Sequence, residues 1–241
     1  FARQSSFAVA DVDVERLRFK RRQSRTFAED APQALRIVRF EQEAFADDRL
    51  LRAVSPLPFV PSGAERDART EEILMIQSTA LLTRMEQVHT QKAVLGVSGG
   101  LDSTLALLVT ARAFDMLKLP REKILSVTMP CFGTTDRTYK NACLLTKKLG
   151  AELKEVSIKE AVAVHFRDLG HSMDDHDVTY ENSQARERTQ VLMDLANENG
   201  GMVIGTGDMS ELALGWATYN GDHMSMYGVN AGVPKTLVRH L

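Results

Sequence analysis

The chain has 241 residues, enough for one large domain or for a domain of common size with a piece of another. Its 44% hydrophobic and 26% charged residues are typical of a folded globular protein, and no apolar run is long enough to span a bilayer. The formal net charge of −2 argues against a broad surface that neutralises nucleic-acid phosphates. We therefore expect neither a membrane protein nor a nucleic-acid-binding protein.

Residues 1–60 differ in pattern from the rest of the chain. Ser6 to Asp13 alternates apolar and polar residues like a strand, and a charge-rich segment follows it. Three prolines, at positions 56, 58 and 61, remove backbone donors within six residues. We predict a linker there, which divides the chain into domains 1–60 and 61–241.

The second domain shows helical and strand patterns in regular alternation. Apolar spacing predicts a helix over residues 69–88. Short β-branched runs at 93–97, 124–129, 153–158 and 202–204 then alternate with helical stretches at 101–117, 138–149 and 184–197. This alternation predicts an α/β fold, a doubly wound and mostly parallel sheet with helices on both faces. Ligands are expected at the carboxyl ends of its strands.

The first strand runs into a segment suited to binding phosphate, made of Gly96, Val97, Ser98, Gly99, Gly100, Leu101, Asp102 and Ser103. Adjacent glycines let the backbone approach an anion and adopt positive φ, and the following helix directs unpaired N–H groups at it. The Gly-Lys-Ser/Thr ending of the Walker loop is missing. The alternative is an ordinary strand-to-helix turn in which Asp102 or Ser103 is the N-cap.

The stretch Ser98-Gly99-Gly100-Leu101-Asp102-Ser103 resembles the PP-loop of the ATP pyrophosphatases. The resemblance implies ATP as a substrate, contacts from residues 96–103 to its phosphates, and AMP and pyrophosphate as products. It also implies Mg²⁺ held by Asp102. The loop alone leaves the second substrate open among GMP synthetases, asparagine synthetases and tRNA-thiolating enzymes.

Four later blocks narrow this choice, at residues 181–188, 205–211, 215–222 and 228–236. In order and spacing they are similar to the signature of the NAD⁺ synthetases, in particular the glutamine-dependent branch, over roughly residues 92–241. The resemblance implies a carbon–nitrogen ligase that adenylates deamido-NAD⁺ and replaces AMP with ammonia. Two rival hypotheses remain, another PP-loop amidotransferase or thiolase, and a nucleotide-binding assembly fragment without turnover.

The resemblance also assigns roles to individual residues of these blocks. Asn182 and Arg186 are implied to lie near deamido-NAD⁺, and Thr206 at ATP. Glu211 becomes the second Mg²⁺ carboxylate or a substrate contact, and Lys235 holds phosphate. A transferring adenylate needs its charge neutralised, which suits Asp102, Glu211 and Lys235 as catalytic residues.

Trp216 is implied to stack at the dinucleotide site, and Asp222 to contact substrate. Simpler interpretations stay open for several of these side chains. Arg186 belongs to a charge run typical of a solvated helix face, Trp216 suits a core aromatic, and Glu211 suits a cap of the next helix. The histidines at 165, 171 and 176 lie near three aspartates without a compact spacing, which favours a polar loop over the site instead of a metal cluster.

Departures from the family concern the adenine loop, where Thr128 and Thr135 stand in place of an arginine and a glutamine of the ammonia-dependent enzymes. Backbone groups at 127–129 remain able to recognise adenine. Cys131 and Cys143 are the two cysteines, and without a recognisable secretory signal they favour a reducing cytoplasm. The sequence shows no residue that would activate Cys131, so we expect it to be a poor nucleophile.

The ends of the chain suggest a piece of a longer protein, truncated within the synthetase part. Residues 1–59 resemble the last strand and tail of the nitrilase-like glutaminase that supplies ammonia in the glutamine-dependent branch. Its Glu-Lys-Cys triad would lie upstream, so we expect this chain to use free ammonia. A homo-oligomer with a dimeric synthetase core is also implied, since related enzymes bind the dinucleotide at dimer interfaces.

Overall fold

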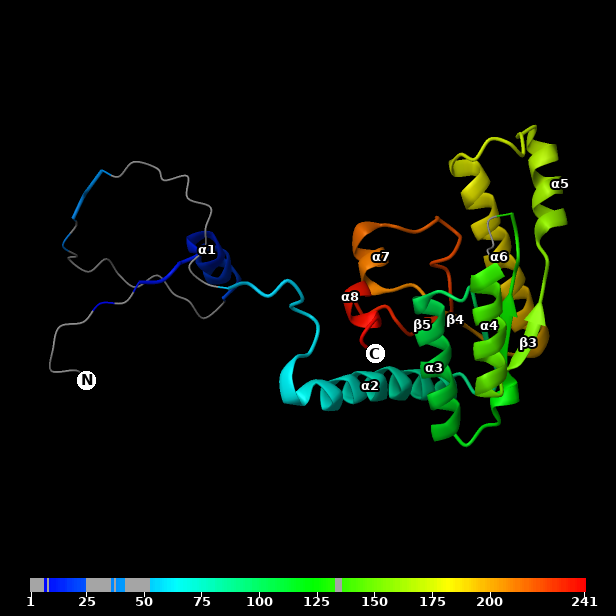
Figure 1. The fold of residues 1–241 in the computed structure, drawn as a ribbon, viewed down its shortest axis with the longest axis horizontal. Coiled ribbons are helices and arrows are strands. Elements are labelled where there is room, and N and C mark those ends of the chain that lie inside the picture. Colours follow the sequence, from blue (N-terminus) through cyan, green and yellow to red (C-terminus); the bar gives the residue numbers. More distant parts are fainter. Residues whose placement is uncertain (1–6, 8, 25–35, 37, 42–52, 133–135) are drawn as a thin grey trace. The chain divides into compact units, whose positions relative to one another are not determined.

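The computed structural model describes residues 7, 9–24, 36, 38–41, 53–132 and 136–241 (Figure 1). Two compact units divide the chain, residues 1–56 and 57–241. The first contains helix α1, Val14–Gln23, none of whose residues is buried. Its N-cap is Asp13, whose carboxylate accepts a hydrogen bond from the Arg16 amide at 2.9 Å. The strand expected over residues 6–13 is absent from the described residues 7 and 9–13, because the segment leads into this capped helix.

The second unit begins with a short 3₁₀ turn, η1 (Gly63–Glu65), and the long helix α2 (Arg66–Gln87). The helix predicted over residues 69–88 is confirmed. α2 buries one stripe, which comprises Gln77, Ser78, Leu81 and Met85. This stripe packs against helix α3 (Leu101–Met116), as Figure 1 shows at the lower edge of the unit.

Five parallel strands form the sheet at the centre of this unit, in the order β3-β2-β1-β4-β5. Their bounds are β1 Ala93–Gly96, β2 Ile124–Thr128, β3 Glu152–Glu155, β4 Met202–Gly205 and β5 Tyr227–Gly228. Ala93 at the start of β1 pairs with Ile124 on one side and with Met202 on the other. The predicted parallel sheet and four of its strands are confirmed. The third strand is shorter than predicted, because residues 156–158 form the connection to helix α5 and not part of the strand.

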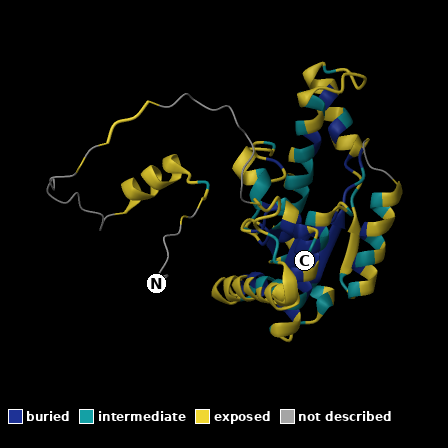
Figure 2. Ribbon diagram, turned by 60° about the vertical axis from the view of Figure 1, so that its left-hand side comes forward, coloured by how far each residue is buried: buried dark blue, intermediate teal, exposed yellow. Residues whose placement is uncertain are grey.

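Helices cover both faces of the sheet, so the predicted three-layer α/β fold is confirmed. β1 alternates accordingly: Ala93 and Leu95 join one apolar cluster, and Val94 joins the other. The first cluster includes residues of α2, α3, α4 (Asp136–Leu149) and α8 (Lys235–Val238). The second includes residues of α5 (Lys159–Leu169) and α6 (Val178–Asn199). Figure 2 shows the buried central strands between the helices, whose outer sides are exposed.

Two short elements complete the described unit, the 3₁₀ turn η2 (Arg121–Lys123) and helix α7 (Met209–Leu214). α6 begins six residues before the predicted start at 184, because Asp177 caps it by accepting hydrogen bonds from the amides of Thr179 and Tyr180. Among the described residues, none of the helices combines the length and the apolar character needed to cross a bilayer.

Candidate active site

The loop between β1 and α3 is shaped by Gly99. This residue has φ +79°, and a Cβ added to it would lie 2.1 Å from the carbonyl oxygen of Thr138. Both the conformation and the space therefore require glycine. Gly100 is the N-cap of α3 and provides no side-chain cap, so neither Asp102 nor Ser103 has the capping role that the simpler interpretation gave them. The first-turn N–H groups of α3 are left without a side-chain acceptor at the cap, which is the arrangement that binds anions.

Three hydroxyl groups hold the loop in this form. The Ser98 hydroxyl accepts a hydrogen bond from the Gly100 amide at 3.2 Å and lies 3.2 Å from the Ser103 hydroxyl. Ser103 in turn donates to the Gly100 carbonyl at 3.1 Å, and Thr104 donates to the same oxygen at 2.8 Å. The loop is thus fixed by its own side chains before any ligand binds.

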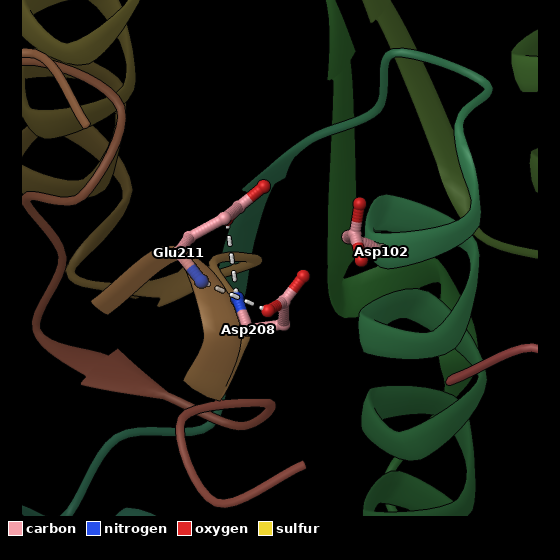
Figure 3. Close-up of side chains that lie close together, drawn as sticks. All are labelled: Asp102, Asp208 and Glu211. Atoms are coloured by element: carbon pink, nitrogen blue, oxygen red, sulfur yellow. Dashed lines mark hydrogen bonds between the residues drawn. The ribbon is translucent and has the colours of Figure 1, made fainter. Parts of the chain in front are cut away.

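A second strand end, that of β4, supplies two more acidic side chains through a capping box. Asp208 caps α7 by accepting hydrogen bonds from the amides of Ser210 (2.7 Å) and Glu211 (3.1 Å). Glu211 Oε2 accepts a hydrogen bond from the Asp208 amide at 3.2 Å. The capping interpretation of Glu211 is therefore confirmed, but it occupies only one carboxylate oxygen. Figure 3 shows Asp102 from α3 facing Asp208 and Glu211.

Lys235 joins these three carboxylates. Its Nζ lies 2.6 Å from Asp102 Oδ2, 2.7 Å from Asp208 Oδ2 and 3.4 Å from Glu211 Oε1. Burial opposes the charge of Lys235, but the contacts with Asp102 and Asp208 outweigh it, so the pKa of Lys235 is raised. Burial also acts to raise the pKa of Asp208, but the Lys235 ammonium and the two capping amides outweigh that effect and lower it. Asp208 and Lys235 are therefore both charged at neutral pH.

The same cluster fits a divalent cation. One oxygen from each of Asp102, Asp208 and Glu211 lies within 4.8 Å of the others, the one such group of His, Cys, Asp and Glu side chains in the described part of the chain. Asp102 Oδ1 is buried and has no hydrogen-bond partner among the described residues. Carboxylate oxygens are the ligands that Mg²⁺ prefers. Sequence reasoning named Asp102 and Glu211 but missed Asp208, whose signal was the Asp-x-x-Glu pattern of a capping box.

Asn230 connects the two strand ends that carry these carboxylates. Its side chain is fully buried, and its amide nitrogen donates to the carbonyl of Asp102 at 2.9 Å and to that of Thr206 at 3.1 Å. Its oxygen accepts a hydrogen bond from Gln77 of α2 at 3.2 Å, and Gln77 also donates to the Val229 carbonyl at 2.8 Å. Sequence reasoning missed this role, since nothing in the spacing marks a buried amide.

A cavity of about 760 Å³ opens beside the loop and the carboxylates, at the carboxyl ends of the strands. This volume suits a nucleotide-sized ligand. Nine of the predicted site residues line it: Gly96, Val97, Ser98, Gly100, Asp102, Ser103, Thr206, Glu211 and Asp222. The other walls come from the end of β2 (127–129), from α6 and from residues 222–225. Thr128 lines the cavity, whereas Thr135 lies outside the described residues.

The remaining predicted residues do not line the cavity. Gly99 and Leu101 belong to the loop without lining the cavity, and Lys235 contacts the Asp102 and Glu211 carboxylates that do line it. Asn182 accepts a hydrogen bond from the Thr218 hydroxyl at 2.8 Å, and Arg186 donates to the Tyr219 carbonyl at 3.0 Å. Both therefore hold the 215–222 segment, in which Asp222 also accepts a hydrogen bond from the Thr218 amide at 2.9 Å.

The structure bears on three further expectations, which concern Trp216, the histidines and Cys131. Trp216 is 78% exposed, so the interpretation as a core aromatic is wrong. His165 lies on α5, whereas His171, His176 and the three aspartates lie in the loop 171–177 between α5 and α6, where His171 contacts Asp177 at 3.0 Å; the predicted polar loop is thus present without His165. Cys131 is buried, and burial raises the pKa of its thiol, which agrees with a poor nucleophile.

A parallel sheet with a glycine-rich loop between its first strand and the next helix defines an α/β protein of the PP-loop type. The sequence model of the NAD synthase family matches residues 74–241, and the chain belongs to this family.

Curated relatives and solved structures that the chain resembles are named as NAD synthetases. The chain is similar to the glutamine-dependent NAD(+) synthetase of Mycobacterium leprae, with 44% identity over 97% of this chain and 36% of the relative. A glutamine-dependent NAD+ synthetase from Acinetobacter baumannii, solved with ADP, matches 74% of this chain and 32% of its own at 30% identity and a TM-score of 0.65. An NH3-dependent NAD synthetase from Campylobacter jejuni matches 70% of this chain and 69% of its own at 26% identity and a TM-score of 0.63. The chain thus spans about a third of the curated relatives that it matches.

Proposed function

We propose that this chain carries the ligase activity that forms NAD⁺ from deamido-NAD⁺, ATP and ammonia, through an adenylated intermediate, with AMP and pyrophosphate as products. One observation carries the proposal. The loop with the cramped, positive-φ Gly99 and the carboxylates of Asp102 and Glu211 border one nucleotide-sized cavity. The names of the relatives, one of them solved with ADP, support it.

The phosphate loop would hold the β- and γ-phosphates of ATP as the leaving group. Residues 96–103 offer backbone amides and two hydroxyls at the start of α3, where the helix dipole favours negative charge. Thr206, at the end of β4, lines the same cavity and is proposed to contact ATP. Donors that are fixed in advance stabilise the charge that develops on the departing pyrophosphate.

Asp102 and Glu211 are the proposed Mg²⁺ ligands, and Asp208 lies close enough to join them. The metal would supply Lewis-acid stabilisation of phosphate charge. Lys235 already neutralises part of the carboxylate cluster, and we propose that it contacts phosphate when ATP is bound. Because the carboxylate of deamido-NAD⁺ is itself the nucleophile, the protein needs mainly to position it and requires no general base.

Deamido-NAD⁺ is proposed to bind near the 215–222 segment. Asp222 lines the cavity, and Asn182 and Arg186 hold the segment in place. Leu214, Trp216 and Tyr219 are each more than three-quarters exposed there. We propose that a second copy of the chain covers this apolar surface and that Trp216 stacks on the dinucleotide at the resulting dimer interface.

The source of ammonia forms a separate part of the proposal. The Mycobacterium leprae relative matches 97% of this chain, whereas the family model starts at residue 74. We propose that residues 1–60 correspond to the end of a glutaminase domain and residues 61–241 to the synthetase domain. In the whole protein glutamine would supply the ammonia, and this chain alone would use ammonium.

Pyrophosphate release tests the proposal directly. With ATP, Mg²⁺ and ammonium chloride, release should depend on deamido-NAD⁺, and NAD⁺ should form in equal amount. Asp102→Ala should abolish it, whereas Asp168→Ala, which removes an exposed carboxylate on α5, should not. Release that depends instead on an unrelated acceptor, such as a xanthine nucleotide, would contradict the substrate assignment. ATP binding without any turnover would favour a binding module.

A further inference from the structure

Two arginines of α6 that look alike in the sequence, Arg186 and Arg188, differ in their surroundings. Arg186 is exposed and donates a hydrogen bond to the Tyr219 carbonyl. Arg188 is half-buried and lines the 760 Å³ cavity together with Ala185, Thr189 and Leu192 of the same helix. The solvated helix face considered for this charge run therefore does not describe Arg188.

The guanidinium of Arg188 has no ion pair or hydrogen bond within the described residues. The Cys131 thiol and the Asp222 carboxylate influence its pKa through charge alone, without a hydrogen bond. Burial dominates and lowers the pKa of Arg188, although an arginine remains charged at any physiological pH. A partly desolvated cation without a partner is unfavourable, so structures rarely keep one without a function.

The rest of the cavity shows what this cation is suited to bind. Arg188 is the one lysine or arginine among the residues described as lining it. It shares the cavity with the phosphate loop, residues 96–103, whose helix start also attracts anions. A planar guanidinium matches the paired oxygens of a phosphate or a carboxylate and binds them through two parallel hydrogen bonds.

We propose that Arg188 binds an anionic oxygen of a substrate inside this cavity, and that its ion pair forms only when the substrate is present. The identity of the anion rests on the proposed function: it is a phosphate of ATP or an anionic group of deamido-NAD⁺. The anion-binding role itself rests on the geometry of the cavity. Arg188 is thus a binding residue additional to Arg186, with a different role.

Substitution of Arg188 tests this through three independent readouts. Arg188→Gln removes the charge and keeps a polar side chain, and Arg188→Lys keeps the charge but loses the planar fork. Arg167→Gln is the matched control, because it removes an arginine that is 74% exposed on α5. Thermal unfolding without ligand, ATP affinity by calorimetry, and the KM for deamido-NAD⁺ are measured for each variant.

We expect the midpoint of unfolding of unliganded Arg188→Gln to stay unchanged or to rise, because an unpaired, half-buried charge is removed. ATP affinity should fall at least tenfold if the anion is a phosphate of ATP. An unchanged ATP affinity with a KM for deamido-NAD⁺ raised at least tenfold would place the anion on the dinucleotide. In either case Arg188→Lys should lie between the wild type and Arg188→Gln, and Arg167→Gln should match the wild type.

Two results would overturn the proposal. One is an Arg188→Gln variant that keeps both affinities. The other is a variant whose unliganded midpoint falls and whose Lys counterpart is no better, which would indicate a packing role. The outcome is separable from that of the proposed function, because calorimetry with ATP needs no turnover. A wild type that binds ATP but makes no NAD⁺ would contradict the function and leave the anion-binding role intact.

Discussion

Replacing Asn230 with alanine should destabilise the protein more than any exposed substitution of the same kind. The fully buried side chain of Asn230 donates to the carbonyls of Asp102 and Thr206 and accepts from Gln77. Alanine removes all three bonds and offers no group in their place. Gln77 keeps its bond to the Val229 carbonyl, so the main losses are the two carbonyl contacts.

The expected magnitude follows from these contacts. A buried polar group left without its partner costs about 1–3 kcal/mol. Asp102 belongs to the first turn of α3, so its carbonyl can still accept a hydrogen bond within the helix after the substitution. Thr206 follows β4 and lies outside any helix, so its carbonyl lacks such a bond. We therefore expect a loss of about 2–4 kcal/mol in the free energy of unfolding. Asn230→Asp should cost at least as much, because a carboxylate oxygen would face the same two carbonyls.

Urea unfolding followed by circular dichroism measures this difference, with Asn141→Ala as the control. Asn141 is exposed on α4, so its replacement should change the free energy by less than about 0.5 kcal/mol. A loss below about 0.5 kcal/mol for Asn230→Ala would refute the reasoning. It would mean that the two strand ends are held together without this amide.

Other predictions concern the loop and the charged cluster. Gly99→Ala should abolish ATP binding in calorimetry, because its Cβ would lie 2.1 Å from the Thr138 carbonyl oxygen. Gly150→Ala is the control, since Gly150 also has a positive φ but faces open space, and it should leave ATP binding intact. An equal loss of binding in both variants would contradict the steric argument. Asp208→Asn keeps a capping side chain but loses the charge, and should lower stability by about 1–2 kcal/mol at neutral pH. The folded pKa of Asp208 is lowered, so this contribution is present above the unfolded value of about 3.9 and is lost as the pH falls through the folded value. The difference between wild type and variant in urea unfolding should therefore be flat from about pH 5 to 8 and shrink below about pH 4; a difference that grows in acid would contradict it. Lys235→Met leaves three carboxylates facing one another, so its unfolding midpoint should fall in EDTA and recover with Mg²⁺, and no recovery would argue against a cation site.

Some strands could be predicted because their residues are buried and therefore mostly apolar. β1, β2 and β4 are buried on both faces and show as continuous apolar runs with β-branched residues. β3 is an edge strand whose four residues are all exposed, so its composition shows little, and its end was placed three residues too late. β5 has two residues, too few for any periodicity, and was missed.

Part of the site could likewise be predicted from residues adjacent in the sequence, whereas the rest depends on the tertiary fold. The loop after β1 is a local signal, because its glycines, hydroxyls and helix start are consecutive in the sequence. The meeting of Lys235 with Asp102 is not local, since 133 residues separate them and only the position of α8 brings them together. The different surroundings of Arg186 and Arg188 depend likewise on which face of α6 meets the cavity.

The proposed function depends on the amides at the start of α3, which are proposed to bind the pyrophosphate that leaves ATP. A crystal structure of this chain with Mg²⁺ and α,β-methylene-ATP, whose α–β linkage cannot be cleaved, tests this contact. The β- and γ-phosphates should lie against residues 98–103, and the metal should lie on Asp102 and Glu211. A nucleotide bound elsewhere, with this loop free of phosphate, would contradict it.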